Sequence, residues 1–130
     1  YKPKFDVEPY ITQSWVNYTK KGQWHHKHRH PNSFVSGVYY VQADEMKDKI
    51  YFFHPKVYHQ LRITPPRDWN LYNSESWFFP VKTGSLVLFP SSLEHMVESV
   101  TSKTERVSLS FNTFLKGYLG QDEEATGLHL

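Results

Sequence analysis

The stretch from residue 106 to residue 114, RVSLSFNTF, alternates between polar and apolar side chains. Successive side chains of a β-strand point to opposite faces of a sheet, so this spacing predicts a strand with one apolar face and one polar face. A polar face this regular lines either solvent or a cavity. The residues on it are Arg106, Ser108, Ser110 and Asn112.

Further short runs rich in β-branched and aromatic residues predict strands along the rest of the chain. They cover residues 11–18, 23–30, 36–42, 50–53, 77–81, 85–89 and 95–100, with 85–89 as a buried strand. We expect a turn or one short helical turn over 43–49, a long proline-containing loop over 54–76, and a loop from 117 onward. Roughly eight short strands separated by turn signals predict an all-β sandwich or barrel with little helix.

Composition narrows the class of protein further. A chain of 130 residues has room for one domain with a sizeable core. Its net charge of only +2 gives no indication of nucleic-acid or membrane binding. The absence of cysteine excludes disulfides, thiolate metal ligands and a cysteine nucleophile, and it fits a reducing compartment, so we expect a cytoplasmic protein.

No targeting segment is recognisable in the sequence. No stretch is long and apolar enough to span a membrane, and no signal peptide is visible. The sequence begins at Tyr1 rather than at a methionine, so we expect a chain trimmed at its N-terminus or a fragment. The missing signals therefore carry little weight, and the sequence does not indicate an oligomeric state.

Four of the chain's eight histidines lie between residues 25 and 30. On a regular strand His26, His28 and His30 share one face, and His25 lies on the opposite face. Imidazole binds iron, zinc, copper and nickel, and three ligands on one side leave open positions for a substrate and oxygen. The alternative interpretation is a solvated basic strand, so this cluster alone does not establish a metal site.

His95 is placed to complete such a site. It follows the run of residues 84–90, a strand that breaks at Pro90 and returns through a short turn. This order places His95 at the start of the neighbouring strand, at the mouth of a barrel. A lone histidine there is more often hydrogen-bonded to the backbone, but beside the first cluster we favour a metal ligand.

Arg106 needs an anionic partner if the polar face of its strand lines a cavity, because an unpaired buried guanidinium is costly. An internal carboxylate, from Glu98, Glu105 or Asp68, is one source of that charge, and a bound ligand is the other. Ser108 lies on the same face and offers its hydroxyl to the same carboxylate. An exposed ion pair on an edge strand is the alternative.

The order of these segments resembles a known family. The matching segments are His-x-His-Pro-Asn-Ser at 28–33, SGVYYV at 36–41, GSLVLFPS at 84–91, His95, and ERVSLSFN at 105–112. Together they resemble the 2-oxoglutarate- and Fe(II)-dependent oxygenases, and more narrowly a small uncharacterised branch found among marine bacteria and their phages. The resemblance runs over most of residues 14–113. It implies a double-stranded β-helix, which is a jelly-roll and cupin-like fold, with iron held at one open end and 2-oxoglutarate as co-substrate.

The resemblance implies that His28 and His95 bind the iron. His28 matches the first histidine of the superfamily's His-x-Asp/Glu motif, and His95 matches its distal histidine. Position 30 departs from the motif, because His30 stands where a carboxylate is usual. We expect His28, His30 and His95 to be the metal ligands and the catalytic residues. The alternatives are His26, with the register moved by two, or a carboxylate from elsewhere in the chain: Asp44, Glu45 or Glu94.

The resemblance also implies a binding site for the co-substrate. Arg106 matches the basic residue that holds the far carboxylate of 2-oxoglutarate, with Ser108 as its helper. In related hydroxylases a tyrosine on the strand after the first motif lies against the co-substrate, which indicates Tyr39 or Tyr40 here. Adjacent side chains of a strand face opposite ways, and we favour Tyr40 because it shares its face with Ser36.

From these residues and this resemblance we expect an Fe(II)- and 2-oxoglutarate-dependent dioxygenase that hydroxylates an unidentified substrate. Its partners are then 2-oxoglutarate, oxygen and that substrate. Two alternatives stay open. One is a non-catalytic, cupin-like module that binds a metal or a carbohydrate, although such a module has no need of Arg106 as a carboxylate clamp. The other is a three-histidine dioxygenase that acts directly on a chelating substrate without 2-oxoglutarate.

Overall fold

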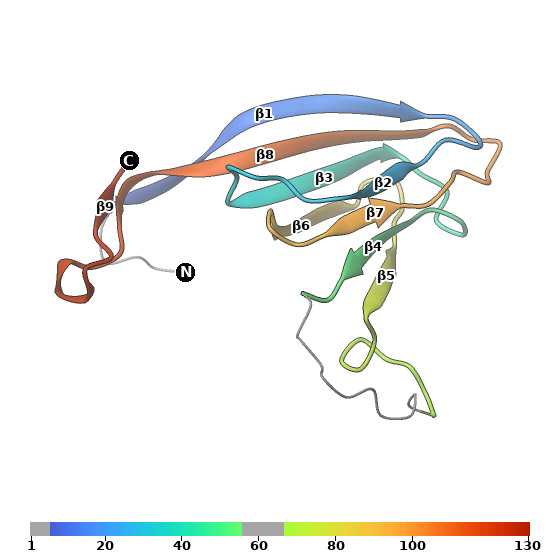
Figure 1. The fold of residues 1–130 in the computed structure, drawn as a ribbon. Helices are drawn as coiled ribbons and strands as arrows, with labels where there is room; N and C mark the ends of the chain where they lie inside the picture. The colour runs from blue at the N-terminus through green and yellow to red at the C-terminus, as the bar shows by residue number, and fades with distance from the viewer. Residues whose placement is uncertain (1–5, 56–66) are drawn as a thin grey trace.

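The chain folds into two antiparallel β-sheets that face each other (Figure 1). The computed structural model describes residues 6–55 and 67–130, so residues 56–66 of the expected 54–76 loop lie outside the described residues. The strands are β1 (Val7–Thr19), β2 (His25–His28), β3 (Val35–Gln42), β4 (Lys49–Phe53), β5 (Ser76–Pro80), β6 (Leu86–Pro90), β7 (His95–Val97), β8 (Arg106–Leu119) and β9 (Leu128–His129), with a 3₁₀ helix η1 (Asp122–Glu124). Across the described residues, no helix is long and apolar enough to cross a membrane. The expected all-β architecture with little helix is confirmed.

The strand order is that of a jelly roll. The larger sheet runs β1-β8-β3-β6, with β9 pairing along β8, and the smaller sheet runs β2-β7-β4-β5. From β1 to β8 the chain passes from one sheet to the other at each connection except that between β4 and β5. Strands that are distant in the sequence therefore become neighbours, as in the pairing of β1 with β8 from Thr19↔Arg106 to Val7↔Gly117.

The apolar core between the two sheets is small. Tyr40 of β3, Ile50 of β4 and Phe89 of β6 pack with Val81, and each of the four is at most 5% exposed. Another part of the interior is polar, because the even-numbered residues of β8 from Arg106 to Asn112 are buried. The polar face predicted from the alternating sequence thus lines a cavity and not solvent.

Two predictions for the C-terminal half are wrong. β7 ends at Val97 and not at residue 100, because Val100 leaves the ladder and exchanges backbone hydrogen bonds with Gly22 and Gln23 (2.9 and 3.0 Å). The loop expected from residue 117 instead holds the end of β8, η1 and β9. β1 pairs with β8 as far as Gly117, and β9 pairs with the two residues of β8 that follow.

The prediction of a buried strand over 85–89 is also wrong. β6 lies at the edge of the larger sheet, and its alternate side chains point away from the smaller sheet. Leu86 and Leu88 are accordingly 54% and 57% exposed, whereas Phe89, on the inner face, is 5% exposed. An uninterrupted apolar run did not distinguish a half-exposed edge strand from a fully buried one.

Candidate active site

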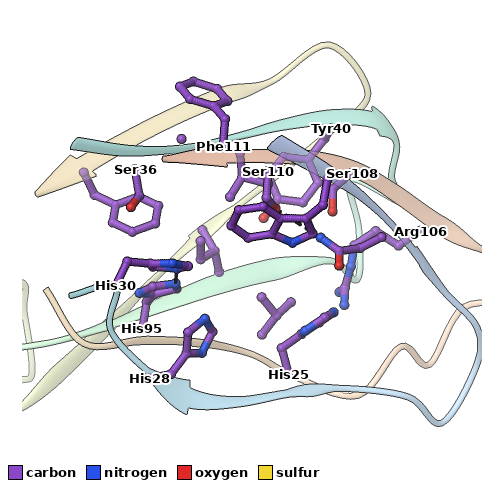
Figure 2. A pocket seen from close by; sticks show the side chains of 17 residues that line it. His25, His28, His30, Ser36, Tyr40, His95, Arg106, Ser108, Ser110 and Phe111 are labelled. Atoms are coloured by element: carbon purple, nitrogen blue, oxygen red, sulfur yellow. Dashed lines mark hydrogen bonds between the residues drawn. The ribbon is translucent and has the colours of Figure 1, made fainter. Parts of the chain in front are cut away.

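A pocket opens between the two sheets, and both sheets contribute to its lining (Figure 2). In Figure 2, His28, His30 and His95 gather on one side of the pocket, and Arg106 lies on the other. The lining consists of residues 15, 17, 25, 28, 30, 36–38, 40, 50, 89, 95, 97, 106, 108 and 110–111. The pocket therefore collects histidines from the smaller sheet and polar side chains from the larger one.

The three histidines predicted as metal ligands lie together. One ligand atom from each of His28, His30 and His95 lies within 4.8 Å of the other two. His28 and His95 are direct partners across the pairing of β2 with β7, which brings their rings to a centroid separation of 4.3 Å. The Nε2 atoms of His30 and His95 are 3.3 Å apart. This arrangement presents three imidazole nitrogens to a single point, as a metal site requires.

Two of these imidazoles are oriented by hydrogen bonds to the backbone. His28 Nδ1 lies 2.6 Å from the carbonyl oxygen of His26, and His95 Nδ1 lies 3.0 Å from that of Leu93. A carbonyl oxygen only accepts, so Nδ1 donates in both cases and the Nε2 lone pair is left for a metal. This is the outer contact that metal-binding histidines usually make.

Burial lowers the pKa of two of the three imidazoles, His30 and His95. Burial lowers the pKa of His95 to about 4, and the positive charge that His28 and His30 can carry lowers it further, against the hydrogen bond to Leu93. The pKa of His30 is also lowered, first by burial and then by His28. Neutral imidazole is the form that binds a metal, so both groups are in the ligating state at neutral pH.

His30 lies beyond the end of β2, and a polar network holds it in place. Its backbone N–H donates to the carbonyl oxygen of Ser91 at 2.9 Å. The Ser91 hydroxyl lies 2.8 Å from the Ser36 hydroxyl, which donates to Asn112 Oδ1 at 2.8 Å. The segments 28–33, 36–41, 84–91 and 105–112, singled out in the sequence, therefore meet at one corner of the pocket.

The alternative metal ligands considered from the sequence are not part of the histidine cluster. Within the described part of the chain, the histidine cluster includes no carboxylate. Glu94 pairs with Lys27 at 3.0 Å, and Asp44 accepts a hydrogen bond from the Met46 N–H in the turn before β4. His26 and Glu45 are exposed.

The predicted orientation of His25 is wrong. His25 lines the pocket, and His26 faces solvent, whereas a regular strand would place them the other way round. The cause is a bulge: His25 pairs with Val97 and His28 pairs with His95, so the register shifts between the two pairs. An inserted residue reverses the alternation of side chains along a strand.

The partner of Arg106 is Asp48, which was not among the carboxylates considered from the sequence. Arg106 Nη1 donates to Asp48 Oδ1 at 3.1 Å, and both side chains are 3% exposed. Asp48 Oδ2 in turn accepts the backbone N–H of Asp44 at 2.8 Å. Asp48 closes the charged turn before β4, and nothing in that turn distinguishes it from the neighbouring acidic residues.

The Arg106 end of the pocket holds two buried donors that lack an acceptor. Among the described residues, the Tyr40 hydroxyl and Arg106 Nη2 have no hydrogen-bond partner, and both side chains line the pocket. Burial raises the pKa of Tyr40 to about 12, so the hydroxyl keeps its proton and can donate. Leaving a buried donor unpaired costs about 1–3 kcal/mol. Both atoms are therefore available to an acceptor that enters the pocket.

The structure separates the two candidate tyrosines and places Ser108. Tyr40 is 1% exposed and points inward, while its neighbour Tyr39 is 40% exposed on the opposite face. Ser108, 6% exposed, follows Arg106 on the inner face of β8 and lines the same pocket. The face-sharing argument from Ser36 therefore identified the tyrosine that lies in the pocket.

β1 supplies two further lining residues that the sequence reasoning did not single out. The rings of Trp15 and His30 lie 5.9 Å apart between centroids, and Asn17 Nδ2 donates to Ser110 Oγ at 3.1 Å. Their alternate positions on a predicted strand indicated a shared face. Without the pairing of β1 with β8, that face could not be assigned to the pocket.

Comparison with known proteins agrees with this geometry. The model of the family described as "Putative 2OG-Fe(II) oxygenase" matches residues 13–112. No curated protein matches the sequence. Among solved structures, an oxidoreductase of the 2OG-Fe(II) oxygenase family from Burkholderia pseudomallei is similar, with a TM-score of 0.59 and 20% identity. The match covers 82% of this chain and 45% of that one, so this chain spans less than half the length of that protein. The likeness supports the jelly-roll fold.

Proposed function

Because the chain belongs to the 2OG-Fe(II) oxygenase family, we propose that it is an Fe(II)- and 2-oxoglutarate-dependent oxygenase that hydroxylates an unidentified substrate. The observation that carries this proposal is one pocket with two different ends. Three clustered imidazoles lie at one end, and at the other lie two buried donors that have no acceptor among residues 6–55 and 67–130.

The histidine end fits a divalent iron. His28, His30 and His95 would hold the ion through three neutral nitrogens, and three ligands on one side leave positions open. When bound, Fe(II) supplies the redox chemistry that couples decarboxylation of 2-oxoglutarate to oxidation of the substrate. The chain's own contribution is to fix the imidazoles through the backbone contacts of His28 and His95.

The other end fits the far carboxylate of 2-oxoglutarate. Arg106 Nη2 and the Tyr40 hydroxyl would donate to it, with Ser108 as the third contact on the same inner face. A charged acceptor makes hydrogen bonds about twice as strong as a neutral one. A dicarboxylate with an oxo-acid head therefore matches both ends of the pocket at once.

The charges of the pocket also favour a dianion. Histidine binds a metal as neutral imidazole, so the ligands themselves would add no charge. Arg106 is already balanced by Asp48 in a pair that is 3% exposed on each side. With a divalent cation bound, the pocket would carry two uncompensated positive charges, which are costly in a buried site. The two carboxylates of 2-oxoglutarate neutralise them.

The all-histidine cluster also fits a second enzyme, a dioxygenase that acts on a chelating substrate without 2-oxoglutarate. In that case the two unpaired donors would hold a carboxylate of the substrate itself. The two proposals differ in whether 2-oxoglutarate binds at the metal.

An anaerobic titration with Fe(II), with and without 2-oxoglutarate, tests the proposal. The wild type should develop the visible charge-transfer band of iron-bound 2-oxoglutarate. A double variant, Arg106→Gln with Asp48→Asn, removes the clamp without leaving one buried charge unpaired, and it should retain iron but lose the band. A wild type that binds iron and shows no band contradicts the proposal and favours the second enzyme. An unchanged band in the double variant removes Arg106 from its assigned role.

A further inference from the structure

His25 is a fourth pocket histidine that the metal cluster does not use. We propose that His25 is a positioning residue for the co-substrate, which it contacts at the far carboxylate together with Arg106 and Tyr40, so that it helps to select a dicarboxylate over a shorter oxo acid. The inference rests on the proposed function and adds a specificity determinant to it.

The bulge in β2 brings His25 into the pocket. His25 pairs with Val97 and His28 pairs with His95, so three steps along β2 correspond to two along β7. Both His25 and His28 then face inward, although their spacing along the chain would place them on opposite faces of a regular strand. One short strand thus supplies an imidazole to each end of the pocket.

The position of His25 separates it from the other histidines. In Figure 2 its ring points toward the Arg106 end of the pocket, away from the group formed by His28, His30 and His95. Burial lowers the pKa of His25, and the positive charge of Arg106 lowers it further. A neutral imidazole keeps one N–H donor and adds no repulsion to the guanidinium.

The pairing of Arg106 with Asp48 explains why a further donor is useful. Arg106 Nη1 donates to Asp48, and the Asp48 carboxylate balances the charge of the guanidinium. An incoming carboxylate therefore meets an ion pair without net charge. Such a carboxylate must be held mainly by hydrogen bonds, and it can accept about four of them. Arg106 Nη2, the Tyr40 hydroxyl and the His25 N–H would reach it from β8, β3 and β2.

Binding titrations with two oxo acids test this role. The first is 2-oxoglutarate, and the second is pyruvate, which has the same oxo-acid head but no far carboxylate. In anaerobic, Fe(II)-loaded protein, His25→Ala should weaken 2-oxoglutarate binding at least about tenfold, the lower end of the effect of losing a hydrogen bond to a charged group. The dissociation constants for pyruvate and for Fe(II) should not change. His25→Asn, which keeps an N–H donor, should recover most of the loss.

His129→Ala is the control, because His129 is an exposed histidine of β9 that does not line the pocket, and it should change none of these constants. If His25→Ala weakens both oxo acids equally, or weakens Fe(II) binding, His25 serves the metal end and the inference is wrong. If His25→Ala binds 2-oxoglutarate as tightly as a wild type that binds it normally, the inference is also wrong. Failure of the wild type to bind 2-oxoglutarate would instead overturn the proposed function and this inference with it.

Discussion

The two ends of the pocket are built in different ways. The histidine end is local: His28 and His30 are two residues apart, and His95 is the direct partner of His28 on the adjacent strand. The arginine end joins Tyr40, Asp48 and Arg106 from both sides of the interior, and its charged pair is almost fully buried. The histidine cluster, in which only His95 is fully buried, can lose a side chain without leaving an unpaired buried charge, whereas neither member of the charged pair can be removed alone in this way. Substitutions at the histidine end should therefore change mainly ligand binding. Substitutions at the arginine end should change ligand binding and also the free energy of unfolding.

Removing Asp48 alone should produce the largest effect, because it leaves the Arg106 guanidinium buried without a counter-charge. We expect Asp48→Ala to lower the free energy of unfolding by about 3–5 kcal/mol, as measured by urea denaturation. Adding Arg106→Met should restore much of this stability. The matched control is Glu8→Ala, which breaks the exposed pair of Glu8 with Lys116 and should have no measurable effect. Equal effects of the two single variants would show that burial does not distinguish the pairs.

His95→Ala should have the next largest effect, and it should act on binding. Loss of one of the three proposed ligands should weaken Fe(II) affinity by at least about 100-fold, because removing only a hydrogen-bond partner of a metal ligand already costs about 10- to 100-fold. The thermal midpoint of the metal-free protein should fall less than it does in Asp48→Ala, because the loss of His95 leaves a cavity beside Phe89 but no unpaired buried charge. Metal affinity measured by competition with a chelator checks the first expectation, and a thermal melt checks the second. A variant that binds iron as the wild type does would exclude His95 as a ligand.

Tyr40→Phe should have a smaller effect that separates binding from folding at the arginine end. The hydroxyl is buried and has no partner among the described residues, so its loss should leave the stability of the unloaded protein unchanged or slightly higher. Affinity for 2-oxoglutarate should fall about tenfold. Tyr39→Phe, on the exposed face, is the control and should change neither quantity. A marked loss of stability in Tyr40→Phe would mean that the hydroxyl is already bonded within the protein.

Over any one pH unit, the pH dependence of stability should show the smallest effect, and it arises at the histidine end. The pKa of His95 is about 4 in the folded protein, against a usual 6.5. Between these values the unfolded chain binds more protons, so the free energy of unfolding should decrease as the pH falls through this range and should level off above it. The contribution of His95 to the slope is at most about 1.4 kcal/mol per pH unit. Urea denaturation of the metal-free protein should show a shallower slope in His95→Gln, and an identical slope would contradict this assignment.

The same contrast explains what could be predicted from the sequence. Strand positions and the inward faces of β3 and β8 followed from alternation, so Tyr40, Arg106 and Ser108 were placed in the pocket correctly. The histidine cluster followed from spacing and from the resemblance. His25 was placed on the wrong face because a bulge has no clear signature in a run of histidines. Asp48 was missed because its partner lies 58 residues away and its own turn carries several acidic residues.

The pairing of β1 with β8 has a consequence for the order of folding. These strands come from opposite halves of the sequence, and together they carry Trp15, Asn17, Arg106, Ser108 and Ser110 to the pocket. Contacts between distant segments require the closure of long loops, which slows folding relative to a protein with local contacts. During synthesis, the pocket cannot close until β8 has left the ribosome. Because His28, His30 and His95 all precede Arg106 in the sequence, the arginine end of the pocket is the last to be completed.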